Sequence, residues 1–201
     1  MEGYSMNTYI APWGARVADF RIRRTKTGKH VLEILLVRVW GGSTIPQAAN
    51  RPQPFYTSKE RWAMPGGKKE PEQDNPLAVL DAEYKEETGV GLNLKRLLDA
   101  GQPHIVASKP SDRMASGTYT EMCFLLPPEW VTESAPASIQ HETDEIAEVR
   151  WFELGAVPLI GEVILSPNQQ RMLAALLRKY KSLFTGFEKE IDLFIMGAEG
   201  V

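Results

Sequence analysis

The sequence is poor in the residues that form cross-links and soft metal sites. It has one cysteine, Cys123, and its three histidines, His30, His104 and His141, stand far apart. One cysteine cannot form a disulfide within the chain and suits a reducing compartment, so we expect a cytoplasmic protein. The spacing of a Cys/His zinc site is missing too. We interpret Cys123 as a small buried side chain, because no His or Asp pattern marks it as a nucleophile.

Long apolar runs and a strong net charge are missing as well. No stretch approaches the roughly 20 apolar residues that a membrane span needs, and the N-terminus lacks the pattern of a signal peptide. The net charge of −3 and the isoelectric point near 5.7 disfavour non-specific binding to nucleic acid or to a membrane surface. With 43% hydrophobic residues, the chain can form one domain with a substantial core.

The most informative stretch covers residues 64–90, MPGGKKEPEQDNPLAVLDAEYKEETGV. A short apolar run ends at Pro65-Gly66-Gly67, which breaks regular structure. Asn75 is predicted to cap a helix that begins at Pro76, where a missing N–H costs nothing. Gly89 stands where a left-handed residue commonly ends a helix. The stretch is therefore predicted to be a glycine turn followed by one helix.

Three acids share one face of that predicted helix. Glu83, Glu86 and Glu87 fall within an arc of about 100°. The helix dipole disfavours acids in the last turn, and like charges at these spacings repel by a few tenths of a kcal/mol per pair. A divalent cation would turn both penalties into attraction, and carboxylate oxygens suit Mg²⁺ or Mn²⁺. A solvated acidic helix end is the alternative for the bare pattern, but the flanking glycine turn and glycine stop favour the metal site.

This stretch resembles the Nudix box, the signature of the Nudix hydrolases, written G-x5-E-x7-R-E-U-x-E-E-x-G-U with U an aliphatic residue. The matching positions are Gly67, Glu83, Glu86, Glu87, Gly89 and Val90. Ala82 stands at the signature arginine, Tyr84 replaces an aliphatic residue, and the loop after Gly67 is one residue too long. The candidates for the upstream glutamate are Glu70, Glu72 and Asp74.

The substitution at Ala82 matters because the family's arginine commonly holds the box carboxylates in place. We expect this role to be taken by another cation or to be lost. The nearest cations in the sequence are Lys68, Lys69 and Arg61. The metal-binding acids themselves remain.

The resemblance implies an α/β fold of the Nudix type, an α/β/α sandwich with a mixed β-sheet between helices. It covers residues 15–182, after a lead-in at 1–14 and before an amphipathic extension at 183–201. It also implies a metal-dependent pyrophosphohydrolase that cleaves the diphosphate bond of a nucleoside diphosphate linked to another group, with Mg²⁺ or Mn²⁺ as cofactor. The alternative, which Ala82 favours, is a non-catalytic Nudix domain that binds a nucleotide or a protein partner.

The implied catalytic and metal-binding residues are Glu83, Glu86 and Glu87, with a backbone carbonyl of Gly66 or Gly67 as a further ligand. The general base would be Glu83 or an acid in the segment 142–148. Its candidates there are Glu142, Glu145 and Glu148. An exposed charged loop is the alternative interpretation of that segment.

Substrate-binding candidates come from three places. Phe55 and Tyr56, in the irregular proline-containing segment 41–59, would stack on a base or instead pin the loop to the body. Arg21 and Arg23 would meet a phosphate chain, or lie on a solvated edge strand. Glu145 is the third candidate. The expected ligand is a small nucleotide-type molecule. The sequence is compatible with a homodimer but does not determine the oligomeric state.

Other elements follow from periodicity and turn residues. Strands are predicted at 15–24, 31–40, 105–108, 118–126 and 149–152. We expect 31–40 to be buried on both faces, Pro127-Pro128 to end a strand, and 92–100 to form a strand or a short connection. A helix is predicted to begin at 166–169 with Gln169 in a capping box. A second amphipathic stretch at 187–195 would pack on the body or on another subunit.

Overall fold

Two long strands near the N-terminus hold the middle of the sheet. The structure is a computed structural model that describes residues 13–39, 61–68, 75–99, 107–110, 118–141, 143, 146–157, 165 and 167–199. The strands are β1 (Trp13–Arg24), β2 (His30–Val39), β3 (Arg61–Ala63), β4 (Gly66–Lys68), β5 (Ala107–Pro110), β6 (Thr118–Val131), β7 (Ser138–Ile139) and β8 (Ile146–Glu153). The helices are α1 (Pro76–Thr88), α2 (Leu94–Asp99), α3 (Pro167–Lys179) and α4 (Glu188–Glu199).

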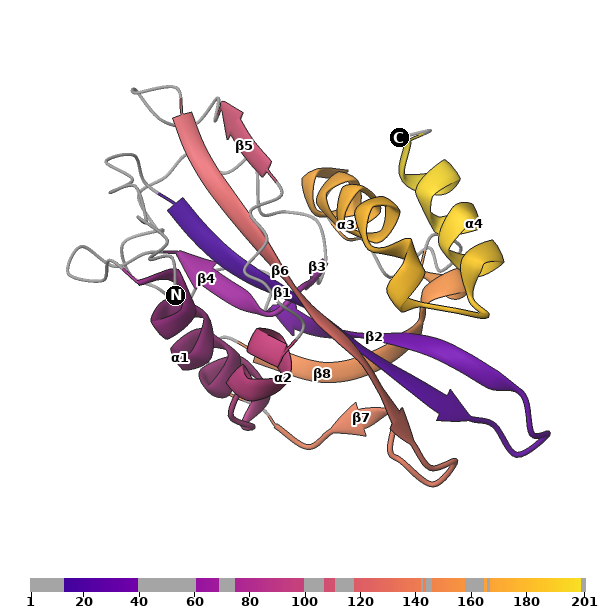
Figure 1. The fold of residues 1–201 in the computed structure, drawn as a ribbon. Coiled ribbons are helices and arrows are strands. Elements are labelled where there is room, and N and C mark those ends of the chain that lie inside the picture. The colour runs from indigo at the N-terminus through magenta and orange to yellow at the C-terminus, as the bar shows by residue number, and fades with distance from the viewer. Residues whose placement is uncertain are drawn as a thin grey trace.

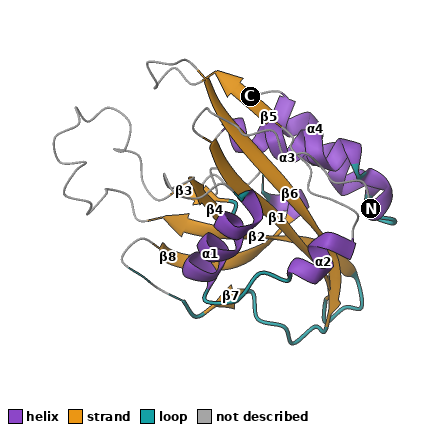
Figure 2. Cartoon of the chain, turned by 60° about the vertical axis from the view of Figure 1, so that its left-hand side comes forward, coloured by secondary structure: helices purple, strands orange, loops and turns teal. Residues whose placement is uncertain are grey.

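The predicted α/β/α sandwich is confirmed, with α1 and α2 on one face of the sheet and α3 and α4 on the other (Figures 1 and 2). The strand order is β5-β6-β1-β2-β8-β7, with β3 attached to β2 and β4 attached to β1. β1 and β6 run parallel, and the other described pairs are antiparallel, so the sheet is mixed as expected. None of the helices in the described ranges is long and apolar enough to cross a membrane.

β2 is buried on both faces, as its continuous apolar run predicts. Leu32, Ile34 and Leu36 belong to the core under α3 and α4. Leu35 and Val37 belong to the core under α1 and α2. This alternation gives the sheet two apolar faces, and each face has its own pair of helices.

The expectation that β1 is an edge strand is wrong. β6 pairs with one side of β1 from Trp13 to Arg23. On the other side β1 pairs with β4 at Gly14–Arg16 and with β2 at Phe20–Arg24. β1 and β2 therefore separate, and the corner between β3 and β4 lies at the split. Val17 N–H donates to the Pro65 carbonyl at 2.9 Å, which attaches this corner to β1.

Two local predictions are wrong. β6 continues past Pro127-Pro128, because Asp19 pairs with Leu126 whereas Arg21 pairs with Glu129, so β6 carries one extra residue in a bulge. A bulge tolerates residues without an N–H. Residues 92–100 contain the helix α2 rather than a strand or a short connection, and Asn93 Oδ1 accepts the Arg96 N–H at 2.9 Å as an N-cap does.

The C-terminal helices pack on the body of the same chain. α3 begins at Pro167 as predicted, and Gly186, with φ 89°, separates it from α4. Phe187, Ile191, Phe194 and Ile195 lie in the same core as α3 and the sheet. The predicted amphipathic stretch thus covers this face of the sheet (Figure 1).

Candidate active site

The turn at Pro65-Gly66-Gly67 presses against β1. Gly66 has φ 132°, a conformation that residues with a Cβ rarely adopt. A Cβ on Gly66 would also lie 2.1 Å from the Ala15 carbonyl oxygen. Only glycine therefore lets the backbone approach β1 this closely. On the other side of the corner, Gln169 Oε1 of α3 accepts the Met64 N–H at 2.9 Å, which ties α3 to this corner.

The helix after the turn has the predicted ends. Asn75 Oδ1 accepts the Leu77 N–H at 3.0 Å, Pro76 occupies the first turn, and Gly89 ends α1 with φ 72°. These local features fix where α1 begins and ends.

Two of the three predicted acids meet the glycine turn. Glu87 Oε2 accepts the Gly66 N–H at 2.7 Å. The Glu83 carboxylate lies against Gly67, where an added Cβ would be 2.1 Å from Glu83 Cδ. Both side chains are half-buried, whereas Glu86 is exposed. The structure thus brings Glu83 and Glu87 together at Gly66-Gly67.

His141 holds the other end of α1, a role that the sequence analysis missed. Its Nε2 donates to the Glu86 carbonyl oxygen at 2.7 Å, one of the carbonyls that a helix end leaves unpaired. Its ring also lies against Gly89, where a Cβ would be 2.6 Å from His141 Nδ1. His141 therefore lies beside the acidic helix end, and it directly precedes the segment 142–148 in the sequence. The sequence holds no signal for this contact, because the partners lie 55 residues apart.

The candidate general bases in that segment are only partly described. Glu142 and Glu145 lie outside the described residues. Glu148, on β8, forms an ion pair with Arg38 at 3.2 Å. Its charge is thus already matched by a cation on β2.

The donors fit a hard cation in chemical type. Two carboxylates converge on the Gly66-Gly67 backbone, and oxygen ligands of this kind suit Mg²⁺ or Mn²⁺. Across the described ranges, no three His, Cys, Asp or Glu side chains are already grouped as a metal site. The exposed Glu86 would have to join Glu83 and Glu87 for the full predicted set.

Arg16 reaches the glycine turn from β1, and this contact was also missed. Its Nη1 donates to the Met64 carbonyl at 2.9 Å and to the Gly66 carbonyl at 3.1 Å, while its Nε donates to Glu121 Oε1 at 2.5 Å. Of the cations expected near the box, Lys68 is exposed. Lys69 and the side chain of Arg61 lie outside the described residues.

The sequence model of the NUDIX domain matches residues 16–176, which include the turn, the acids and Arg16. The chain belongs to the Nudix family, the family of the Nudix hydrolases. A comparison with curated proteins gives no match.

Solved structures of Nudix proteins resemble this chain. A mutT/nudix family protein from Listeria innocua has a TM-score of 0.50 and 15% identity, and the match covers 86% of this chain and 95% of that one. A NUDIX family hydrolase from Clostridium perfringens has a TM-score of 0.40 and 12% identity, with 96% and 98% covered. The Listeria match supports the Nudix fold.

Arg21 and Arg23 lie away from the Nudix turn. Arg21 Nε contacts Glu33 Oε2 at 2.6 Å, and Arg23 Nη2 contacts Glu33 Oε1 at 2.7 Å. Arg21 also stacks over Trp151, at 4.4 Å from the ring centroid. Arg21 lies five residues after Arg16 along the strand, a distance of about 16 Å. Both arginines therefore form ion pairs with Glu33 on the α1 side of the sheet. Of the other substrate-binding candidates, Phe55, Tyr56 and Glu145 lie outside the described residues.

Tyr84, where the Nudix signature has an aliphatic residue, serves a buried polar network. Its hydroxyl donates to Asp19 Oδ2 at 2.8 Å, and Arg96 Nη2 donates to Asp19 Oδ1 at 3.2 Å. Burial raises the pKa of Asp19 to about 6, against the lowering effect of Arg96. It also raises the pKa of Tyr84, which stays protonated as the donor. The phenol thus ties the Nudix helix to β1.

Cys123 is buried as expected, and burial raises its pKa to about 12.

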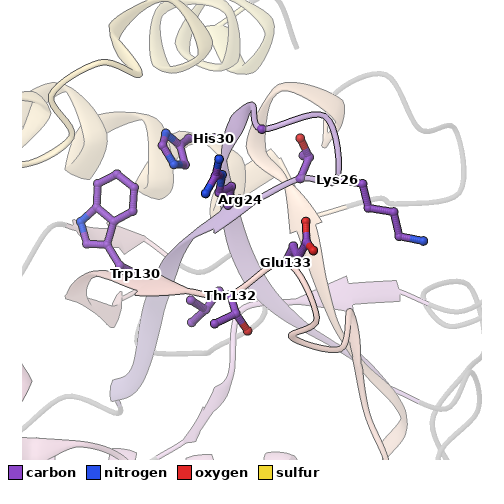
Figure 3. A pocket seen from close by; sticks show the side chains of 9 residues that line it. Arg24, Lys26, His30, Trp130, Thr132 and Glu133 are labelled. Carbon is purple, nitrogen blue, oxygen red and sulfur yellow. The ribbon is translucent and has the colours of Figure 1, made fainter.

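A hollow of about 570 Å³ lies elsewhere, at the end of β1 away from the turn (Figure 3). Its lining includes Arg24, Lys26, His30, Trp130 and Glu133, which carry both signs of charge. Trp130 is 65% exposed and packs edge-on against His30, with ring centroids 4.9 Å apart. The residues that line this hollow include neither the glycine turn nor the box acids.

Proposed function

We propose that this Nudix protein is a metal-dependent pyrophosphohydrolase acting on a nucleoside diphosphate linked to another group. The observation that carries the proposal is the convergence of Glu83 and Glu87 on Gly66-Gly67. Two like charges beside one turn repel each other, and a divalent cation on hard oxygen donors offsets that repulsion.

Each residue then has a defined role. Glu83, Glu86 and Glu87 would hold Mg²⁺ or Mn²⁺, with the Gly66 carbonyl as a further donor. A bound ion would supply positive charge to the phosphate oxygens and would lower the pKa of the attacking water. Glu83, or an acid in 142–148, takes the proton as the water oxygen bonds to one phosphorus and the bond from that phosphorus to the bridging oxygen breaks. The proposed substrate is a small molecule, and the proposed location is cytoplasmic.

Substrate recognition in this proposal falls to the segment 41–59. Phe55 and Tyr56 offer flat rings to a base, and Glu145 follows by four residues His141, which binds the acidic end of α1. Arg21 and Arg23 are less suited, since Glu33 already binds both guanidinium groups.

The test is a hydrolysis screen with Mg²⁺ or Mn²⁺ over dinucleotides, sugar nucleotides, coenzyme A and oxidised nucleotides. We expect Glu86→Gln and Glu87→Gln each to lower kcat/KM by about 100-fold, the scale of one lost preorganised electrostatic contact. Calorimetric titration with Mn²⁺ should show weaker binding in both variants. Glu199→Gln, an exposed acid on α4, is the matched control and should change neither quantity. Unchanged metal-dependent turnover in both box variants would contradict the proposal.

The second candidate is a non-catalytic Nudix domain that binds a nucleotide or a protein. The observation that favours it is Ala82, an exposed residue of α1 whose methyl group cannot bind a carboxylate. A parent protein that binds nucleotides but releases no product across the screen would establish this function instead.

A further inference from the structure

We propose that Arg16 is a positioning residue that holds the glycine turn of the Nudix site, in place of the arginine that the box carries where this chain has Ala82. The inference rests on the proposed function, because the turn matters through the acids that it orients. Arg16 would act on those acids through the backbone of the turn.

Three successive carbonyls of the turn accept hydrogen bonds from two neighbouring residues of β1. Arg16 Nη1 donates to the Met64 and Gly66 carbonyls at 2.9 and 3.1 Å. The Val17 N–H donates to the intervening Pro65 carbonyl at 2.9 Å. One guanidinium nitrogen thus bridges the two carbonyls on either side of the proline, so the turn cannot rotate without breaking several bonds.

Peptide planarity carries this restraint to the acids. The Pro65–Gly66 peptide has its oxygen on Val17 and its N–H on Glu87 Oε2 at 2.7 Å. The next peptide has its oxygen on Arg16 and leads directly to Gly67, whose Cα faces the Glu83 carboxylate. Since each peptide unit is rigid, fixing the oxygen on the β1 side also fixes the side that meets the acid. A carbonyl oxygen has two lone pairs, so Gly66 can accept from Arg16 and still offer one to a cation.

Arg16 is itself held in place. Its Nε donates to Glu121 Oε1 at 2.5 Å, and the two side chains are 21% and 18% exposed. The parallel register of β1 and β6 pairs Gly14 with Glu121, which places this acid beside Arg16. By the alternation along β1, both lie on the face that α3 and α4 cover, opposite α1. A charge-assisted bond of this kind orients the guanidinium before it meets the turn.

The test compares Arg16→Ala with Arg96→Ala as a matched control. The Arg96 side chain is 19% exposed and also binds carboxylates and backbone carbonyls, but its partners Asp19, Phe20, Pro127 and Glu129 lie near α2. Four quantities are measured in each protein. They are the Mn²⁺ dissociation constant without substrate, kcat and KM, hydrogen exchange at the Gly66 amide, and the unfolding midpoint.

We expect Arg16→Ala to raise the Mn²⁺ dissociation constant about 10-fold, as loss of a supporting contact does at metal sites. It should lower kcat more than it changes KM and speed exchange at the Gly66 amide. Arg16→Lys should fall between the parent and Arg16→Ala, because an ammonium lacks the planar fork that binds Glu121 through Nε and the two carbonyls through Nη1. Arg96→Ala should lower the unfolding midpoint while leaving Mn²⁺ binding and Gly66 exchange unchanged.

A second variant tests whether Arg16 takes the place of the box arginine that is missing at Ala82. Ala82 is exposed, so Ala82→Arg has room and should restore part of the Mn²⁺ affinity in the Arg16→Ala protein while changing the parent little. Equal effects of Arg16→Ala and Arg96→Ala on Mn²⁺ binding and Gly66 exchange would overturn the inference. A parent without hydrolytic activity would overturn the proposed function instead, and exchange at Gly66 would still decide whether Arg16 holds the turn.

Discussion

At the scale of single residues, the site depends on the absence of a side chain at Gly67. A Cβ there would lie 2.1 to 2.4 Å from the Glu83 carboxyl atoms, closer than any van der Waals contact. The obstructing atoms are the end of a flexible side chain, which can move aside. The protein should therefore still fold with a methyl group at this position. The Glu83 carboxylate, however, should be displaced.

We predict that Gly67→Ala lowers kcat/KM by at least about 10-fold and weakens Mn²⁺ binding, because Glu83 must leave its place beside the turn. The free energy of unfolding should change by less than about 1 kcal/mol. Activity assays and urea unfolding measure the two effects. Gly91→Ala is the control, since a Cβ there meets nothing within 4 Å. Full Mn²⁺ affinity in Gly67→Ala would show that Glu83 does not bind from this position.

At the scale of elements, α4 belongs to the core although the family match ends at residue 176. Phe194 is 1% exposed and lies in one cluster with α3 and the sheet, whereas the adjacent Leu193 is 60% exposed. Phe184 also packs edge-on against Phe20 of β1, with centroids 5.0 Å apart. The C-terminal segment thus completes the layer that covers one face of the sheet.

Phe194→Ala should therefore destabilise the protein by about 3–5 kcal/mol, the cost of truncating a buried aromatic ring. Leu193→Ala, one residue away on the exposed side of the same helix, should stay within about 0.5 kcal/mol. Denaturant unfolding gives both values. A similar small loss for the two variants would mean that α4 does not share the core of the sheet.

At the scale of the whole molecule, one buried polar network joins several elements. Asp19 of β1 binds Tyr84 of α1 and Arg96 of α2, and Arg96 also donates to the Pro127 carbonyl at the bulge in β6. Asp19 is 3% exposed, and the pKa of its carboxyl group is raised to about 6 mainly by burial. Global stability should therefore depend on the ionisation of this single group.

The folded protein keeps a proton on Asp19 between about pH 4 and pH 6, whereas the unfolded chain has released it. The stability contributed by Asp19 is thus fully present below about pH 4 and is lost as the pH rises to about 6, by at most about 3 kcal/mol. Asp19→Asn cannot titrate, so the difference in unfolding free energy between parent and variant should shift by this amount. Urea unfolding at pH 4, 5, 6 and 7 measures it, and a constant difference would contradict the prediction.

The sequence by itself determined the elements whose signals are local. Asn75, Pro76 and Gly89 define both ends of α1 by contacts within a few residues, and the apolar run of β2 requires burial on both faces. The three box acids follow from spacing along one helix. The layered fold follows from these elements, because each apolar face needs a partner.

Only the tertiary structure decided the contacts between distant segments. Arg16 and Glu121 lie 105 residues apart, and the register of β1 on β6 brings them together. The same register places the Pro127-Pro128 bulge and makes β1 a central strand rather than an edge. The choice of strand neighbours depends on how whole faces pack, and this information is spread over the chain instead of residing in any local pattern. The hydrogen bonds from Arg16 and Val17 to the glycine turn therefore depend on the folded sheet.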